Sequence, residues 1–266
     1  MAYEIKELGV GGILDQAIRI VKDHFGLLFG IVAVLFLPFS LLASFVELAM
    51  TPTIPDDPTK INLAEVMQAA QQAQLYSAPF YLLNALIISP LTNAAIVFAT
   101  ANLYLGRSAS IGESFSRAVK LIIPLLITNI LVGLAVFGGL ILLIIPGIIF
   151  AFWFALSNHV VILEDISGPK ALGRSRQLMK GNIGTLIVLG LLVGLIQLAL
   201  IFGLGMFLPG VLQVIAVDVV IAILVVFLTA AYVVFYFSCR CKAENFDLNM
   251  LADAVADGES TGSPSR

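Results

Sequence analysis

Six long apolar runs, separated by short polar segments, dominate the hydropathy pattern of this 266-residue chain. A helix of about 20 residues crosses the roughly 30 Å hydrocarbon core of a bilayer. The runs lack the alternation of barrel strands, and lipid offers no partner for backbone polar groups, so helices are expected. The pattern predicts an all-α integral membrane bundle of six transmembrane helices, over residues 25–49, 78–105, 121–145, 147–163, 183–208 and 211–239.

Proline–glycine pairs mark two of the connections. Pro146-Gly147 and Pro209-Gly210 supply turn chemistry, so spans three and four, and spans five and six, are predicted to form antiparallel hairpins. The one sizeable outward loop, residues 51–77, opens with the proline-rich TPTIPDDP. It continues as NLAEVMQAAQQAQ, with Asn62 as helix cap and Glu65 three residues later, which predicts a short cap helix.

A short amphipathic segment precedes the first, third and fifth spans: GGILDQAIRIVKDHF, SIGESFSRAVKLI and GPKALGRSRQLMK. Helical spacing in the first segment places Ile13, Leu14, Ala17, Ile18, Val21 and Phe25 on one face, and Asp15, Gln16, Arg19, Lys22 and Asp23 on the other. When Leu14, Phe115 and Leu172 are superposed, a small residue recurs three positions later in each segment: Ala17, Ala118 and Ser175. We therefore predict three pseudo-repeats, each an interfacial amphipathic helix followed by a helical hairpin. The alternative is that any basic cytoplasmic loop of a bundle looks like this.

Composition agrees with a membrane protein. Apolar residues make up 60% of the chain and charged residues 12%, against about 25% in soluble proteins. Two cysteines, Cys239 and Cys241, form no disulfide framework. We expect a single membrane domain over residues 1–253 and a disordered tail over 254–266. No nucleic-acid partner and no cofactor is expected.

The distribution of basic residues predicts the orientation in the membrane. Of the 14 lysines and arginines, only Lys60 falls on the far side of the predicted bundle. By the positive-inside rule both termini are cytoplasmic. Charged residues at Glu4, Lys6, Glu7 and Asp15 argue against a cleavable signal peptide, so the first span is expected to be retained.

Asp218 is the main candidate for intramembrane chemistry, because an ionisable group inside a span is costly. It follows Gly210 by eight residues, which places it about 12 Å below the outer turn. We predict a polar site near the midplane formed by Asp218, Asn84, Asn93, Asn158 and Gln197. The alternative is that these amides and Asp218 form structural hydrogen bonds between helices. Glu47, at the outer end of the first span, is expected to meet water.

The stretch LEDISGPKALGRSRQLMKGN (163–182) is dense in charge. Glu164 and Asp165 adjoin the helix that carries Lys170 and Arg174, so capping and a local ion pair are expected rather than paired catalytic acids. We predict no catalytic residue and no metal site. The basic faces are expected to contact anionic lipid headgroups through Arg19, Lys22, Arg117, Lys120, Lys170, Arg174 and Lys180.

The segments LYLGRSASIGESFSRAVK, VVILEDISGPKALGRSRQLMKGN, IIPGIIFAFWF and FYFSCRCKAENFDLNMLAD resemble a bacterial membrane-protein superfamily, which includes the membrane domain of glycerophosphoryl diester phosphodiesterases. The resemblance covers residues 12–253 and implies a six-helix module of the bacterial cytoplasmic (inner) membrane. It implies recurrent positions at Glu164, Ala171, Leu172, Ser175, Arg240 and Asp247. Ser238 departs from the pattern, which commonly has an acidic residue there. The soluble phosphodiesterase module is not expected in this chain, because neither His24 nor His159 lies in its His-Arg-Gly context.

The sequence is compatible with two functions. The first is a noncatalytic membrane module that organises lipids or an unidentified partner protein, which predicts a packed midplane. The second is a transporter or channel for a small or amphiphilic solute, which predicts an open cavity lined by Asp218 and the amides. An intramembrane enzyme is the least supported class.

Overall fold

The computed structural model describes residues 3–50, 63–208 and 210–244. These residues are largely helical and contain no β-strand. The helices are α1 (Val10–Asp23), α2 (Phe25–Met50), α3 (Leu63–Leu83), the π-helical η2 (Asn84–Ile88), α4 (Ser89–Tyr104), α5 (Ile111–Leu142), α6 (Ile144–Trp153), α7 (Ser157–Glu164), α8 (Pro169–Met179), α9 (Ile183–Phe207) and α10 (Gly210–Glu244). The predicted tail and the predicted cap residue Asn62 lie outside the described residues.

The predicted spans are confirmed as six helical segments that are long and apolar enough to cross a membrane: Phe25–Ala49, Gln74–Tyr104, Ile111–Leu142, Ile144–Glu164, Ile183–Phe207 and Gly210–Glu244. Large apolar side chains such as Met206 and Phe207 point away from the protein. An exposed apolar surface of this extent is what lipid-facing helices require. The chain is a multi-pass membrane protein with an all-α bundle fold.

Helix continuity differs from the sequence prediction at three places. The second amphipathic segment is not a separate helix, because α5 runs unbroken from Ile111 through Pro124 to Leu142. The predicted cap helix is likewise the first part of a longer helical segment, since α3 continues through η2 into α4. The fourth span is divided into α6 and α7 by a turn at 154–156. Flanking helical propensity therefore extends two spans beyond their apolar runs.

The hairpin between α5 and α6 does not turn at Pro146-Gly147, which corrects the prediction. The chain reverses at Leu143, an extended residue with φ −160°, and Pro146 and Gly147 already lie in α6. A Cβ atom on Gly147 would stand 2.5–2.6 Å from Leu140 atoms, including its backbone nitrogen. Gly147 thus permits close packing of the two helices. The second predicted turn does fall at Gly210, which has φ +55°.

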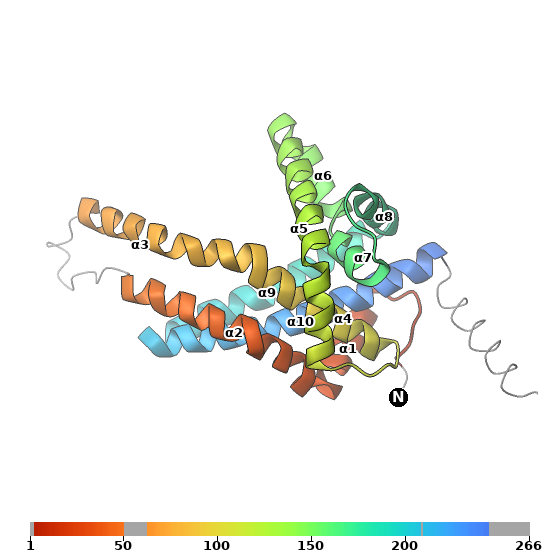
Figure 1. The fold of residues 1–266 in the computed structure, drawn as a ribbon, viewed down its shortest axis with the longest axis horizontal. Coiled ribbons are helices and arrows are strands. Elements are labelled where there is room, and N and C mark those ends of the chain that lie inside the picture. Colours follow the sequence, from red (N-terminus) through yellow and green to blue (C-terminus); the bar gives the residue numbers. More distant parts are fainter. Residues whose placement is uncertain (1–2, 51–62, 209, 245–266) are drawn as a thin grey trace, which may run out of the picture.

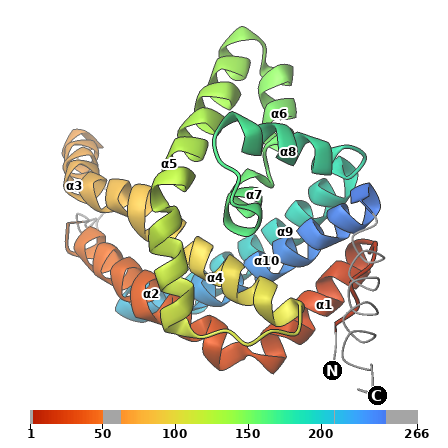
Figure 2. The same ribbon diagram turned by 45° about the vertical axis from the view of Figure 1, so that its right-hand side comes forward.

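Helix α10 is the central element of the bundle. It packs against α1, α2, α4, α8 and α9, and its second half is buried from Thr229 to Cys239 apart from Tyr232. The α5–α6 hairpin projects away from this body in both views (Figure 1 and Figure 2). Helix α5 is joined to the body mainly through α4 and α7, and α8 lies beside α6 and α7. The well-packed core therefore gathers at one end of α10.

Helix α1 turns a different face to the bundle from the one its pattern indicates. Its buried residues are Ile13, Gln16, Ala17 and Ile20, whereas Ile18 and Phe25 are exposed. Gln16 was assigned to the wet face, but its Nε2 donates to the backbone oxygen of Glu4 at 2.9 Å. The N-terminal segment folds over this side of α1, and that covers a glutamine which an isolated helix would expose.

Candidate functional site

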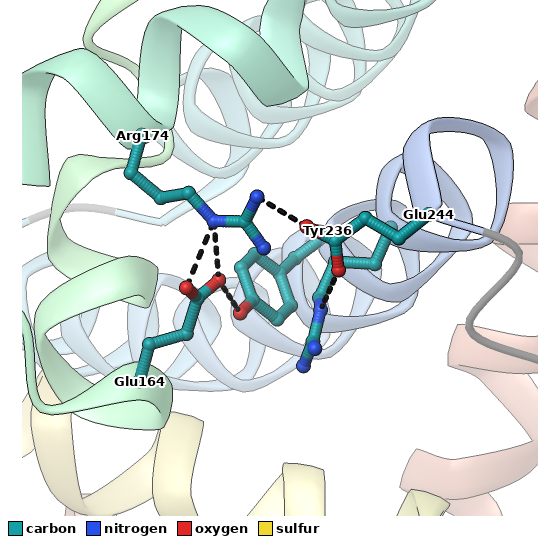
Figure 3. A network of polar contacts seen from close by, with 5 residues as sticks. Glu164, Arg174, Tyr236 and Glu244 are labelled. Atoms are coloured by element: carbon teal, nitrogen blue, oxygen red, sulfur yellow. Dashed lines mark hydrogen bonds and ion pairs between the residues drawn. The ribbon is translucent and has the colours of Figure 1, made fainter. Parts of the chain in front are cut away.

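A polar network joins α7, α8 and α10 at the end of the bundle where α10 terminates (Figure 3). Arg174 Nε donates to both carboxylate oxygens of Glu164, at 3.1 and 2.8 Å. The Tyr236 hydroxyl donates to Glu164 Oε1 at 2.6 Å. The side chains of Arg174 and Glu164 are only 19% and 13% exposed, so this ion pair is largely shielded from water.

The network continues along α10 to Glu244. Arg174 also pairs with Glu244 through its Nη1, and Arg240 Nε donates to Glu244 Oε2 at 3.2 Å. Burial lowers the pKa of Arg174, but hydrogen bonds and charge from Glu244 and Glu164 outweigh it and hold that pKa above its ordinary value. The guanidinium therefore stays charged. The carboxylates in the network are bound to guanidinium groups, which suits a structural clamp better than acid–base chemistry.

Three arginines line one cavity beside this network, which we call the arginine pocket. Its volume is about 190 Å³. Arg107, Arg117 and Arg240 come from the α4–α5 connection, α5 and α10, and Asn102 adds an amide. The rest of the wall is apolar: Phe98, Ala101, Leu105, Ile162, Leu163 and Phe237. None of the described residues that line the pocket is acidic, although Arg117 and Arg240 also pair with acids outside the lining, so the pocket combines basic side chains with apolar contact.

Local structure positions each arginine. Helix α4 ends in a Schellman motif, in which the Gly106 amide donates to Leu103 O at 3.0 Å and the Arg107 amide donates to Asn102 O at 2.8 Å. Gly106 takes φ +75°, a conformation that glycine adopts readily. Arg117 is held by an ion pair with Asp165. Arg240 is held by Glu244, while the side chain of Arg107 is exposed.

A second pocket lies between α2 and α10 and is named here the Asp218 pocket. It has a volume of about 320 Å³ and is lined by Ser44, Glu47, Leu48, Gly210, Gln213, Val214, Val217 and Asp218. Asp218 is 7% exposed, accepts a hydrogen bond from Ser44, and leaves Oδ2 without a partner among the described residues. Glu47 Oε2 accepts from the Tyr81 hydroxyl at 2.6 Å.

The predicted midplane site is not assembled as one cluster. The Asp218 pocket contains none of the four predicted amides. Asn93 lines a different cavity of about 150 Å³ with Ser89, Thr92 and Thr229. Asn84 lies in η2, Asn158 in α7 and Gln197 on the exposed surface of α9. The buried Oδ1 atoms of Asn84 and Asn158 have no partner among the described residues.

The seven basic residues predicted to contact lipid fall into two groups. Five side chains are exposed and available to headgroups: Arg19, Lys22, Lys120, Lys170 and Lys180. Arg117 and Arg174 are partly buried and engaged in ion pairs with Asp165 and Glu164. The predicted local pairing of Glu164 with Arg174 is thus confirmed. Asp165, in contrast, adopts φ +57° after α7 and pairs with α5.

Several residues that shape these sites were not predicted to do so. Arg107 and Glu47 line pockets only because helices distant in the chain meet there. Ser238, where the resembling superfamily commonly has an acid, instead ties down the N-terminal segment: its Oγ accepts from the Leu8 amide at 2.8 Å. Short-range spacing predicts helix faces but not which faces meet across the bundle.

The apolar helices and their ion-paired end define a class, the multi-pass α-helical membrane proteins. The profile of a family described as a domain of unknown function (DUF8558) matches residues 115–259, more than half of the chain. The chain belongs to this family. The match includes Arg117, Asp218 and Arg240, but Glu47 and Arg107 precede it. No curated protein and no solved structure matches the chain.

Proposed function

We propose that this protein is a noncatalytic module of a bacterial cytoplasmic membrane that binds the phosphate groups of anionic lipids at its cytoplasmic surface. The observation that carries the proposal is the arginine pocket, where three arginine residues line one cavity that also has an apolar wall. Guanidinium forks match phosphate oxygens, and apolar side chains suit a glycerol backbone or the first methylenes of an acyl chain.

The position of the pocket supports a lipid as the ligand. By the positive-inside rule, the end of α10 that carries Arg240 and Lys242 faces the cytoplasm, where anionic lipid headgroups lie. The exposed Lys120 and Lys180 stand at the same predicted surface. A phosphate that enters the pocket leaves its acyl chains free to follow the apolar helices.

We also propose that the chain contains three pseudo-repeats and is related to the membrane domain of glycerophosphoryl diester phosphodiesterases. The three superposed small residues, Ala17, Ala118 and Ser175, are each 0% exposed. Each lets an amphipathic segment approach its neighbour closely, which supports a common packing role. In this proposal, the segments present their basic faces to the membrane surface and their small residues to the bundle.

The transporter alternative has weaker support. It needs a continuous path, yet the Asp218 pocket and the Asn93 cavity are separate along α10. Ala222 and Val226, which follow Asp218 by one and two helical turns, are 0% exposed. A packed segment at this level favours a module that binds at its surface over one that conducts a solute through the bundle.

Native mass spectrometry of the full chain in detergent tests the proposal. We expect more bound phosphatidylglycerol than phosphatidylcholine at equal lipid concentration. Arg107→Gln should weaken phosphatidylglycerol binding about fivefold, because a basic residue near a membrane surface contributes roughly 1 kcal/mol. Arg107 is exposed, so this substitution leaves the fold intact. Inorganic phosphate at millimolar concentration should not displace the lipid.

The matched control is Lys170→Gln, a neutralisation of an exposed base on α8 outside the pocket. It should change phosphatidylglycerol binding less than Arg107→Gln does. Equal effects of the two variants would mean diffuse surface attraction and would contradict a site. Displacement of the lipid by inorganic phosphate would reassign the pocket to a soluble anion.

A further inference from the structure

A carboxylate held inside a membrane protein without a full set of partners requires a reason. Asp218 lies in a segment that crosses the membrane, and its Oδ2 has no hydrogen-bond partner among the described residues. A buried charge costs several kcal/mol unless another charge or hydrogen bonds compensate it. Oδ2 itself is buried, but the Asp218 side chain lines the Asp218 pocket, so a ligand bound there can approach the carboxylate.

The pocket also brings a second acidic group close to the first. Glu47 lies on α2 one helical turn nearer the helix end than Ser44, the hydrogen-bond donor to Asp218. Tyr81 on α3 fixes the Glu47 carboxylate through a 2.6 Å hydrogen bond. Gln213 adds an amide to the same wall. None of the described residues that line the pocket is a lysine or an arginine, so its field favours a cation.

Size and lining indicate an organic cation rather than a bare ion. A volume of about 320 Å³ falls at the lower end of small-molecule sites, which span about 300–1,000 Å³. Leu48, Val214 and Val217 supply an apolar wall beside the carboxylates. Such a pocket fits an ammonium group on a short apolar chain, with the charge at Asp218 and the chain against the valines.

We infer that the Asp218 pocket binds a small amphiphilic organic cation through the carboxylates of Asp218 and Glu47. The site is independent of the proposed lipid function. Asp218 and Arg240 are about 33 Å apart along α10 at 1.5 Å per residue, so the two pockets lie at opposite ends of one helix. By the predicted orientation, the Asp218 pocket belongs to the outer half of the membrane.

Isothermal titration calorimetry with hexylammonium chloride tests this assignment. The full chain is placed in phosphatidylcholine nanodiscs, which carry no net lipid charge to attract the probe. We expect hexylammonium to bind at least tenfold more tightly than neutral hexanol, because hexanol lacks the charge. It should also bind more tightly than methylammonium, because the shorter cation leaves the valines uncovered.

Three substitutions locate the binding. Asp218→Asn, which preserves shape, should lower hexylammonium affinity at least tenfold, and Glu47→Gln should lower it severalfold. Glu113→Gln, an equal charge change at the start of α5, should have no effect. If Asp218→Asn fails to fold, Val214→Trp serves instead, because it fills the pocket and keeps both carboxylates.

Three results overturn the inference. One is wild-type affinity in folded Asp218→Asn or folded Val214→Trp. Another is equal affinity for hexylammonium and hexanol, which would show that charge plays no part. A third is equal affinity for methylammonium and hexylammonium with full displacement by sodium, which would show a site for simple cations.

Discussion

Arg174 holds Glu164 by donating from one Nε atom to both carboxylate oxygens, at 3.1 and 2.8 Å. The two residues come from α8 and α7, on either side of the connection 165–168. Tyr236 of α10 shares the same carboxylate. The Glu164 side chain therefore links the two short helices α7 and α8 to the central helix α10. The charged residues of the stretch 163–182 thus stabilise the fold, whether or not a ligand binds.

Arg174→Met should destabilise the protein severely, because it leaves Glu164 and Glu244 without a shared cation in a shielded site. Loss of one partner from a buried ion pair costs about 3–5 kcal/mol. The free energy of unfolding in mixed micelles, followed by circular dichroism during denaturant titration, gives the measurement. Lys170→Met on the same helix is the control and should stay within about 0.5 kcal/mol of wild type. Similar losses for the two variants would refute the clamp.

Gly147→Ala should destabilise the α5–α6 hairpin. The added Cβ would lie 2.5 Å from Leu140 Cγ and 2.6 Å from Leu140 N, so the helices must separate. Overpacking of this kind costs about 1–3 kcal/mol. Gly138→Ala is a matched control on α5, because a Cβ there meets nothing within 4 Å. Thermal unfolding midpoints of the two variants in one detergent make the comparison, and no difference would contradict the close approach.

Ser175→Ala should destabilise the protein, because it leaves the buried backbone amide of Leu156 without a hydrogen-bond partner. The Ser175 hydroxyl accepts from the Leu156 amide at 3.1 Å and donates to the Trp153 oxygen at 2.8 Å, where α6 meets α7. An unsatisfied buried donor costs about 1–3 kcal/mol. Ser116→Ala, at an exposed position of α5, should be neutral. Hydrogen exchange at Leu156, read by mass spectrometry, should accelerate only in Ser175→Ala.

Hydropathy alone was enough to predict the all-α class and the six spans, since both depend on a length of apolar sequence that lipid demands. Helix ends were less predictable. The chain reverses at Leu143, although Pro146-Gly147 is the pair that resembles a turn. Gly147 instead lies within α6, where it is required for close packing with Gly139 of α5. Local preferences for turn residues do not reveal where a neighbouring helix must pack closely.

The candidate sites were predicted only in part. Asp218 stood out because an acid inside an apolar run is unusual, and the structure does place it in a pocket. Its neighbours in the pocket are Ser44 and Glu47, whereas the predicted neighbours were four amides at similar depth. Depth along a span follows from residue counting, but rotation about the helix axis and the choice of partner helix depend on packing across the bundle.

The orientation of the chain can be tested by labelling engineered cysteines from either side of the membrane. Cys239 and Cys241 are buried and can be replaced first to give a background without native thiols. Lys22→Cys, Lys120→Cys and Lys180→Cys lie at exposed positions on the basic side, and Gln72→Cys lies at an exposed position of α3. The positive-inside rule predicts that an impermeant maleimide added to intact cells labels only Gln72→Cys. Disruption of the cells should then make the other three reactive. Labelling of Lys120→Cys in intact cells would show that the orientation is the opposite of the predicted one. The arginine pocket would then lie on the outer surface and the Asp218 pocket on the cytoplasmic side.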